Sequence, residues 1–386
     1  MKKTLIALAV LGAAAGVAHA QSNVTIYGVV DTGYIKRSGQ DVEMGENVNN
    51  RLGFRGVEDL GGGVKATFEL ERRFDLNNGE AKNEKDWDGA ANVGLKSDTW
   101  GAVRLGRVNE LTTETIRKFD PFYQYGVAGM IEGTQRSARI DNTIRYDSPN
   151  WSGFHFGASY SLGQNTHEDS AKWTVENGEL VMTEVWDAKD WGEGYDNDGY
   201  GIMLGYDNGP LSLVGNWSKV ADSADSTVWN LGAAYRFGDA KVELLYQQTK
   251  DKGFMRGGYS GVDRDALMAM SPDSRTKFFG ADGKYANIEE LDSLNQKQWL
   301  LGLEWKLGPG RLNASAQWME VEFAGAGVSD KDIYKYGIGY TYDLSKRTAI
   351  YGNVAYTDYD DEVVARAFGD ADDSVTAVQF GITHKF

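Results

Sequence analysis

The chain has 386 residues, no cysteine and a net charge of −16. The lack of cysteine excludes a disulfide framework and a thiolate metal site, and the acidic balance argues against a nucleic-acid-binding protein. Beyond the N-terminus, no stretch of about 18 consecutive apolar residues occurs, which excludes a helical membrane protein.

The N-terminus has the pattern of a secretory signal peptide. Lys2 and Lys3 precede an apolar run from Leu5 to Val17, and Ala18-His19-Ala20 resembles a cleavage site. The run is too short to span about 30 Å of hydrocarbon. We therefore expect residues 1–20 to be removed, leaving residues 21–386 as a single domain. Loss of the two lysines would change the net charge from −16 to −18.

Alternation of side chains with a period of two dominates the rest of the chain, as expected for β-strands with two different faces. Tyr334, Tyr336 and Ile338 alternate with Lys335 and Gly337, for example. Roughly 16 such segments occur, each near the length of about 10 residues that a tilted spanning strand needs. They start near residues 23, 50, 62, 87, 99, 138, 151, 198, 210, 226, 239, 297, 309, 331, 346 and 374.

The connections between these segments alternate in length. Tight turns are expected at 59–62, 97–99, 148–150, 207–210, 237–239, 307–310 and 343–345, with longer loops near 38–49, 76–86, 108–137, 164–197, 219–225, 251–296, 322–330 and 358–373. Short turns at one end and long loops at the other are typical of outer-membrane barrels. A soluble β-sandwich is the alternative, but its strands need no aromatic girdle.

Backbone groups find no water in hydrocarbon, so strands can cross a membrane only as a closed sheet. The sequence therefore predicts an all-β protein, a 16-stranded antiparallel transmembrane β-barrel. A barrel of this size is too wide for side chains to fill, so it should hold water. Lys65, Thr67 and Glu69 have the parity expected for a lining of this lumen.

The loop at 108–137 is the best candidate for a constriction folded into the lumen. It carries the acidic residues Glu110, Glu114, Asp120 and Glu132, whereas the facing wall would supply Arg51, Arg55, Arg73, Arg104 and Arg145. Opposed acidic and basic rows would set a transverse field across an aqueous neck, and charged rings set ion preference. Arg107 has the lipid-facing parity and would contribute only if the chain has already turned inward there.

Several motifs resemble those of the trimeric general porins of Gram-negative bacteria, especially the neisserial and β-proteobacterial branch. They are residues 24–31, 51–63, 103–107, 144–149, 344–349 and 381–386. The resemblance implies a homotrimer in the bacterial outer membrane, with the third loop folded into the pore. It also implies that Arg51, Arg107 and Arg145 are wall arginines and that the barrel-assembly machinery recognises the terminal Phe386.

Two other classes of function remain open. The long acidic loops suggest a surface adhesin or antigen, with divalent cations or lipopolysaccharide as possible ligands of residues 164–197, although a solvated loop is the simpler interpretation. An outer-membrane hydrolase would need a histidine such as His155 or His167 beside a partner, and nothing in the sequence places one so. No enzyme activity, cofactor or metal is expected.

The sequence therefore favours an outer-membrane porin for passive diffusion of ions and small hydrophilic solutes, with a substrate-specific porin as the alternative. The expected partners are other copies of the chain, outer-membrane lipid and lipopolysaccharide, the assembly machinery and the solutes. Because acidic charge concentrates cations at the mouth of a pore, the net charge suggests a weak cation preference.

Overall fold

The computed structural model describes residues 23–82, 85–131, 139–163, 170–176, 179–186, 198–221, 226–251, 293–324, 329–360, 364–365 and 372–386. Its strands are β1 Asn23–Arg37, β2 Glu43–Gly45, β3 Arg51–Gly61, β4 Val64–Arg73, β5 Ala90–Ser97, β6 Gly101–Asn109, β7 Arg139–Asp147, β8 Phe154–Ser161, β9 Ser170–Glu176, β10 Glu179–Trp186, β11 Gly199–Asn208, β12 Leu211–Lys219, β13 Thr227–Phe237, β14 Ala240–Asp251, β15 Ser293–Leu307, β16 Gly310–Ala324, β17 Lys331–Asp343, β18 Thr348–Tyr359 and β19 Ser374–Lys385. The helical elements are α2 Leu111–Ile116 and the 3-10 turn η1 Arg117–Phe119. No helix among these residues has the length and hydropathy needed to cross a membrane.

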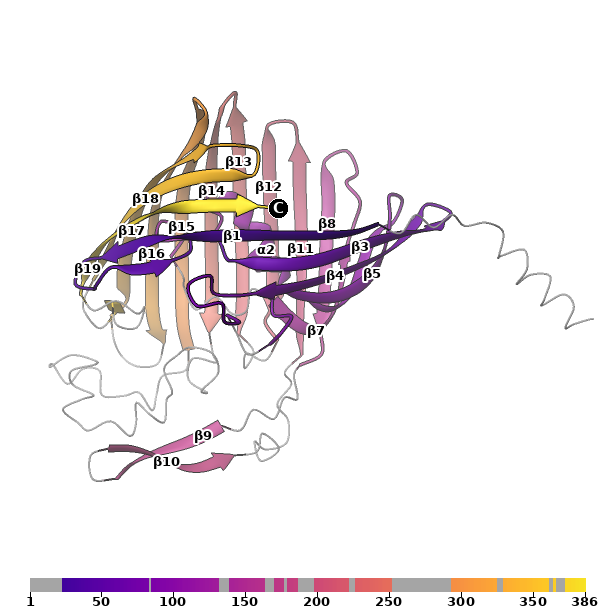
Figure 1. The fold of residues 1–386 in the computed structure, drawn as a ribbon. Coiled ribbons are helices and arrows are strands. Elements are labelled where there is room, and N and C mark those ends of the chain that lie inside the picture. The colour runs from indigo at the N-terminus through magenta and orange to yellow at the C-terminus, as the bar shows by residue number, and fades with distance from the viewer. Residues whose placement is uncertain are drawn as a thin grey trace, which may run out of the picture.

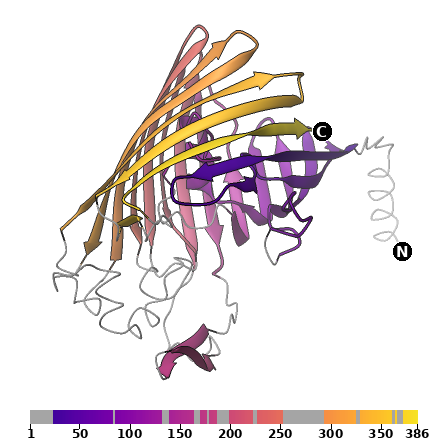
Figure 2. The same cartoon turned by 60° about the vertical axis from the view of Figure 1, so that its left-hand side comes forward.

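All strands except β9 and β10 belong to one antiparallel sheet, which closes on itself (Figure 1). Apart from the three-residue β2, this sheet has sixteen strands, and β1 pairs with β3 on one side and β19 on the other. Gly28 and Phe386 exchange two backbone hydrogen bonds of 3.1 Å at this closure. Figure 2 shows the indigo β1 alongside the yellow β19. The expected 16-stranded barrel is confirmed.

The outer face of the barrel carries the apolar side chains that the alternation predicts. Tyr336, Ile338, Leu301 and Phe380 each expose more than half of their surface on this face. Aromatic residues meet in register across neighbouring strands, as in the pairs Trp217–Trp229 and Trp299–Trp318. This arrangement fits an apolar band bounded by an aromatic girdle in lipid.

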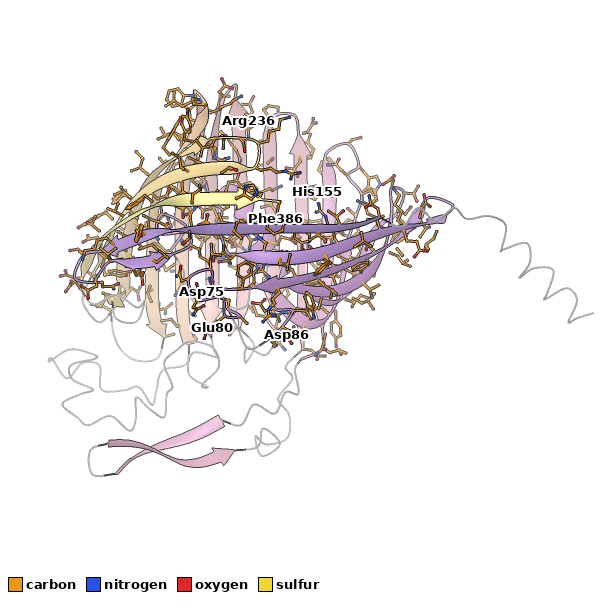
Figure 3. All side chains as sticks on the ribbon, in the orientation of Figure 1. Asp75, Glu80, Asp86, His155, Arg236 and Phe386 are labelled. Carbon is orange, nitrogen blue, oxygen red and sulfur yellow. The ribbon has the colours of Figure 1, made fainter. Side chains whose placement is uncertain are left out.

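Short turns connect the strands at one end of the barrel. Several of them contain a glycine with positive φ, including Gly62, Gly209, Gly238 and Gly308, because a tight hairpin needs a left-handed residue. Figure 3 places Arg236 at this end, whereas Asp75, Glu80 and Asp86 lie towards the end with the longer connections. The two-sided asymmetry predicted for an outer-membrane barrel is thus present.

Three elements within the expected loops are new. Strand β2 adds to β1 beside the first long connection, and the hairpin β9–β10 lies beyond one end of the barrel (Figure 1). The short helix α2 occupies part of the third long loop. Its six residues are too few to produce a sustained helical periodicity in the sequence.

The inner face differs from one half of the barrel to the other. Along β3–β8 it is polar and charged, as expected for a wall beside water. Along β11–β17 the inward positions include Met203, Leu245, Leu300, Met319 and Ile333, which are buried. Only another layer of protein inside the barrel can bury these side chains, and residues 110–131 supply that layer.

Candidate functional site

Residues 110–131, here called the inner segment, lie against the inward side chains of β8 and β11–β19. Helix α2 contacts β8, β11, β12 and β13. Leu111, Ile116 and Phe119 pack with the inward Val214 and Leu300 in one buried cluster. Further along, Phe122, Val127 and Ala128 pack with inward residues of β1, β18 and β19. Apolar contacts therefore fix the inner segment to one half of the wall.

Amide side chains of the wall complete this attachment by bonding to the backbone of the inner segment. Asn313 Nδ2 donates to the Pro121 carbonyl at 2.8 Å. Gln317 accepts from the Ile131 N–H at 2.7 Å and donates to the Gly129 carbonyl at 3.3 Å. Irregular backbone at membrane depth needs such partners, because no strand neighbour satisfies it.

Two of the four acidic residues expected at the constriction have internal roles instead. Glu110 is buried and caps helix α2, accepting from the Thr113 N–H at 2.7 Å. Asp120 is also buried, and its carboxylate accepts from the N–H groups of Phe122, Gln124 and Met130 at 2.8–2.9 Å. Neither acid faces an arginine of the opposite wall. Glu132 lies outside the described residues.

The Asp120 carboxylate organises an unusual turn. Tyr123 and Gln124 both have positive φ, at 56° and 64°, a region that non-glycine residues rarely adopt. The N–H groups that bind Asp120 come from this turn and from Met130 beyond it, so the carboxylate stabilises the backbone conformation of Tyr123 and Gln124. Burial raises the pKa of Asp120, although these donors and Lys335 act in the opposite direction.

Glu114 is the one expected acid that meets a wall arginine. It forms an ion pair with Arg145. Arg145 also bonds to Asp147 at 2.8 Å, and Arg104 binds the Asp147 carboxylate at 2.6 Å. Burial alone would raise the pKa of Glu114, but Arg145, Asn109 and Arg104 together lower it. The Arg104 and Arg145 charges are therefore balanced locally by Glu114 and Asp147.

Four other arginines gather around Tyr125 of the inner segment. Arg117 lies over the Tyr125 ring, with its Cζ atom 5.6 Å from the ring centroid. Arg51 and Arg73, on β3 and β4, act electrostatically on the same phenol. Arg139, on β7, lies within electrostatic range of Arg73 and Arg117. We call Arg51, Arg73, Arg117 and Arg139 the arginine cluster.

Among the described residues, one carboxylate forms an ion pair with the arginine cluster. Glu71 accepts from Arg73 Nε at 2.8 Å, and both side chains are buried. Burial alone would raise the pKa of Tyr125, but Arg117, Arg51 and Arg73 lower it. Tyr125 therefore lies beside the positive charges of Arg51, Arg73 and Arg117, where the inner segment faces β3 and β4.

The remaining predicted arginines lie elsewhere. Arg55 is exposed on the inner face of β3, two residues after Gly53 along the strand. Its guanidinium lies over the Tyr27 ring. Arg107 follows a β-bulge after Gly106 and binds the Asp88 carbonyl at 2.8 Å and Asp141 at 2.5 Å. The structure does not bring Arg107 into the arginine cluster.

Sequence reasoning missed Arg117, Arg139 and Tyr125. Arg139 has the same parity as Arg145 on one strand, which was an available signal. Arg117 and Tyr125 lie in the loop at 108–137, whose acids alone were predicted to form the constriction.

His155 and His384, the histidines among the described residues, belong to no group that could hold a metal ion. His155 faces inward, and its Nε2 lies 3.6 Å from Asp207, which is paired with Lys118 of the inner segment at 3.0 Å. These groups tie the inner segment to β11. His167 lies outside the described residues.

A family model described as Gram-negative porin matches residues 7–362. The chain belongs to this family. It is 32% identical to outer membrane porins of Bordetella pertussis and Delftia acidovorans, and both alignments cover 100% of each chain. A major outer membrane protein of Neisseria meningitidis is 28% identical over 69% of this chain and 85% of the relative.

Among solved structures, an anion-selective porin from Comamonas acidovorans is similar, with a TM-score of 0.68 and 26% identity. The alignment covers 95% of this chain and 100% of that structure. The closed barrel and these relatives establish this porin as an outer-membrane channel for passive diffusion of ions and small hydrophilic solutes. Its relatives are transport channels rather than enzymes.

Proposed function

We propose that the inner segment narrows the lumen and that the arginine cluster makes the resulting neck favour small anions over cations. The observation that carries this proposal is the gathering of four arginines from four different elements around one phenol. Like charges repel, so holding four arginines close together costs free energy. A passing anion would relieve this repulsion. Among the described residues, the acids of the inner segment are buried, capping or already paired.

The net charge of the chain suggested the opposite preference. Ion preference is set by charges close to the narrowest point, however, because charges beyond about 10 Å are screened at moderate salt. Glu110 and Asp120 are turned into the protein, and Glu114 is bound to Arg145. The anion-selective relative from Comamonas acidovorans supports the same direction.

The purified porin in planar bilayers tests this proposal. With a gradient of potassium chloride across the membrane, the reversal potential should have the sign of a chloride-preferring channel. A reversal potential of the cation sign would overturn the proposal.

Tyr125 gives the neck an expected pH dependence. Its pKa lies below the ordinary value near 10, so the phenol loses its proton in the alkaline range, and the phenolate adds one negative charge to the neck. Anion preference should therefore fall as pH rises through that range. Replacing Tyr125 with phenylalanine should remove this step, and a step that persists in the variant would contradict the assignment. Reversal potentials measured from pH 7 to pH 10.5 provide the comparison.

We also propose a homotrimer in contact with outer-membrane lipid and lipopolysaccharide through the exposed apolar outer face. Relatives support this assembly, including a solved porin described as a trimer form, which shares the fold. Light scattering in detergent should give a mass of three chains, and a monomer would contradict the proposal.

Phe386 is proposed as the signal for the barrel-assembly machinery, after removal of residues 1–20. The side chain remains exposed next to the β1–β19 closure (Figure 3). Replacing Phe386 with serine should lower the amount of barrel in the outer membrane in cells, and normal amounts would contradict this role.

A further inference from the structure

Three arginines on the inner side of the barrel lie over tyrosine rings. Arg117 lies 5.6 Å from the Tyr125 centroid in the arginine cluster. Arg55 lies 5.1 Å from the Tyr27 centroid, on β3 and β1. Arg311, on β16, lies 5.8 Å from the Tyr123 centroid. We call these the three Arg–Tyr pairs.

The pairs occupy successive places along the lumen. The pair of Arg117 and Tyr125 belongs to the neck. Arg55 lies in the middle of β3, six residues before its end, and lines a cavity of about 700 Å³ together with Asp98 and Ser148 of two short turns. Arg311 follows directly on the short turn between β15 and β16, on a different part of the wall. An anion leaving the neck towards the short-turn end therefore meets further Arg–Tyr pairs.

Hydrogen bonds hold the rings of these pairs in place. Tyr27 donates to Glu69 at 2.8 Å, and Tyr123 donates to Glu304 at 3.1 Å. Tyr125 interacts through its phenol with Arg51. All three tyrosines are half-buried rather than covered. Each pair thus presents a fixed aromatic surface next to a guanidinium.

A guanidinium and an aromatic ring side by side match one class of solute especially well. The planar guanidinium binds a carboxylate through two parallel N–H groups and also stacks on aromatic faces. A flat ring gains additional attraction from stacking on a tyrosine or an arginine. An aromatic acid can use both interactions together, whereas chloride uses only the charge and a saturated ring cannot stack in the same way.

We propose that the three Arg–Tyr pairs make this porin favour planar aromatic carboxylates among small organic anions, with Arg117 and Tyr125 as specificity-determining residues. This inference rests on the proposed anion preference of the neck. It concerns discrimination among anions, which net charge at the neck does not provide.

Benzoate and cyclohexanecarboxylate are suitable probes, because they have the same charge and a similar size but only benzoate is flat and aromatic. Reversal potentials with each sodium salt against sodium chloride give their relative permeabilities. In the unmodified porin, benzoate should be about two- to fivefold more permeant than cyclohexanecarboxylate. Equal permeabilities would overturn the inference.

Variants then locate the effect. Tyr125→Leu should reduce the preference for benzoate, and Tyr125→Phe should keep it. Arg117→Lys retains the charge but not the planar group, so it should reduce the benzoate preference. Tyr336→Leu, on the lipid-facing side, is the matched control and should change nothing. A benzoate preference as large in both Tyr125→Leu and Arg117→Lys as in the unmodified porin would overturn the assignment.

The two proposals fail separately in these experiments. A cation sign in potassium chloride would refute the anion preference, whichever organic acid is more permeant. A chloride preference without discrimination between the two acids would refute only the aromatic preference.

Discussion

Replacing Arg51 and Arg117 together with glutamine is expected to abolish the anion preference of the channel. Each arginine contributes a unit charge to the arginine cluster, one from β3 and one from the inner segment. In water, a unit charge about 7 Å from a passing ion contributes about 0.6 kcal/mol, favouring the anion and disfavouring the cation. The permeability ratio should therefore change by about sevenfold for each arginine and by about fiftyfold for both.

Reversal potentials in potassium chloride at low and high salt measure this change. The difference between the variant and the unmodified porin should shrink at about 1 M salt, because screening shortens the reach of each charge to about 3 Å. Arg236→Gln is the matched control, since Arg236 lies among the short turns at the end of the barrel (Figure 3). A double variant that keeps the original chloride preference would exclude the arginine cluster as the selective element.

The strands could be predicted from sequence because lipid imposes a rule on every second residue. Tyr336 and Ile338 have to be apolar, whereas their neighbours Lys335 and Gly337 do not, so the period of two is visible without a structure. The closing pair of β1 and β19 followed from the same rule, since a spanning sheet cannot leave an edge unpaired. The boundaries differ from expectation by only a few residues for this reason.

The inner face could be predicted only in part. Parity correctly placed Leu300 on the inner side, but parity does not say what covers it, and the structure covers it with the inner segment rather than with water. The roles of the acids in the inner segment could not be predicted for a similar reason. Glu110 and Asp120 act on nearby backbone groups, which depends on local geometry that charge counting does not contain.

Arg107 illustrates a third limit. It belongs to residues 103–107, whose resemblance to porin motifs implied a wall arginine, whereas its parity pointed outward. A β-bulge after Gly106 shifts the register there, and bulges redirect side chains without a clear signal in the sequence. The structure gives Arg107 a role in binding Asp88 and Asp141, whereas Arg139 takes a place in the arginine cluster.

Replacing Phe119 with alanine is expected to release part of the inner segment while leaving the barrel closed. Phe119 is fully buried, and its ring lies so close to Gly232 of β13 that a β-carbon there would be 2.8 Å from it. Removing a buried phenylalanine ring costs about 3–5 kcal/mol. A loss of about 3 kcal/mol from the attachment would raise the detached fraction of the inner segment about a hundredfold.

The barrel should tolerate this change because its closure depends on strand pairing, and β13 pairs with β12 and β14 along its whole length whatever covers its inner face. Single-channel recordings of Phe119→Ala should therefore show noisier currents and a larger open conductance than the unmodified porin. Phe380→Ala removes the same ring from the lipid-facing side and should leave the current unchanged. Gly232→Val should disrupt the same contact from the barrel wall, because the added side chain would displace the Phe119 ring. Quiet currents of normal size in both Phe119→Ala and Gly232→Val would mean that the apolar contacts with Phe119 do not hold the constriction in place.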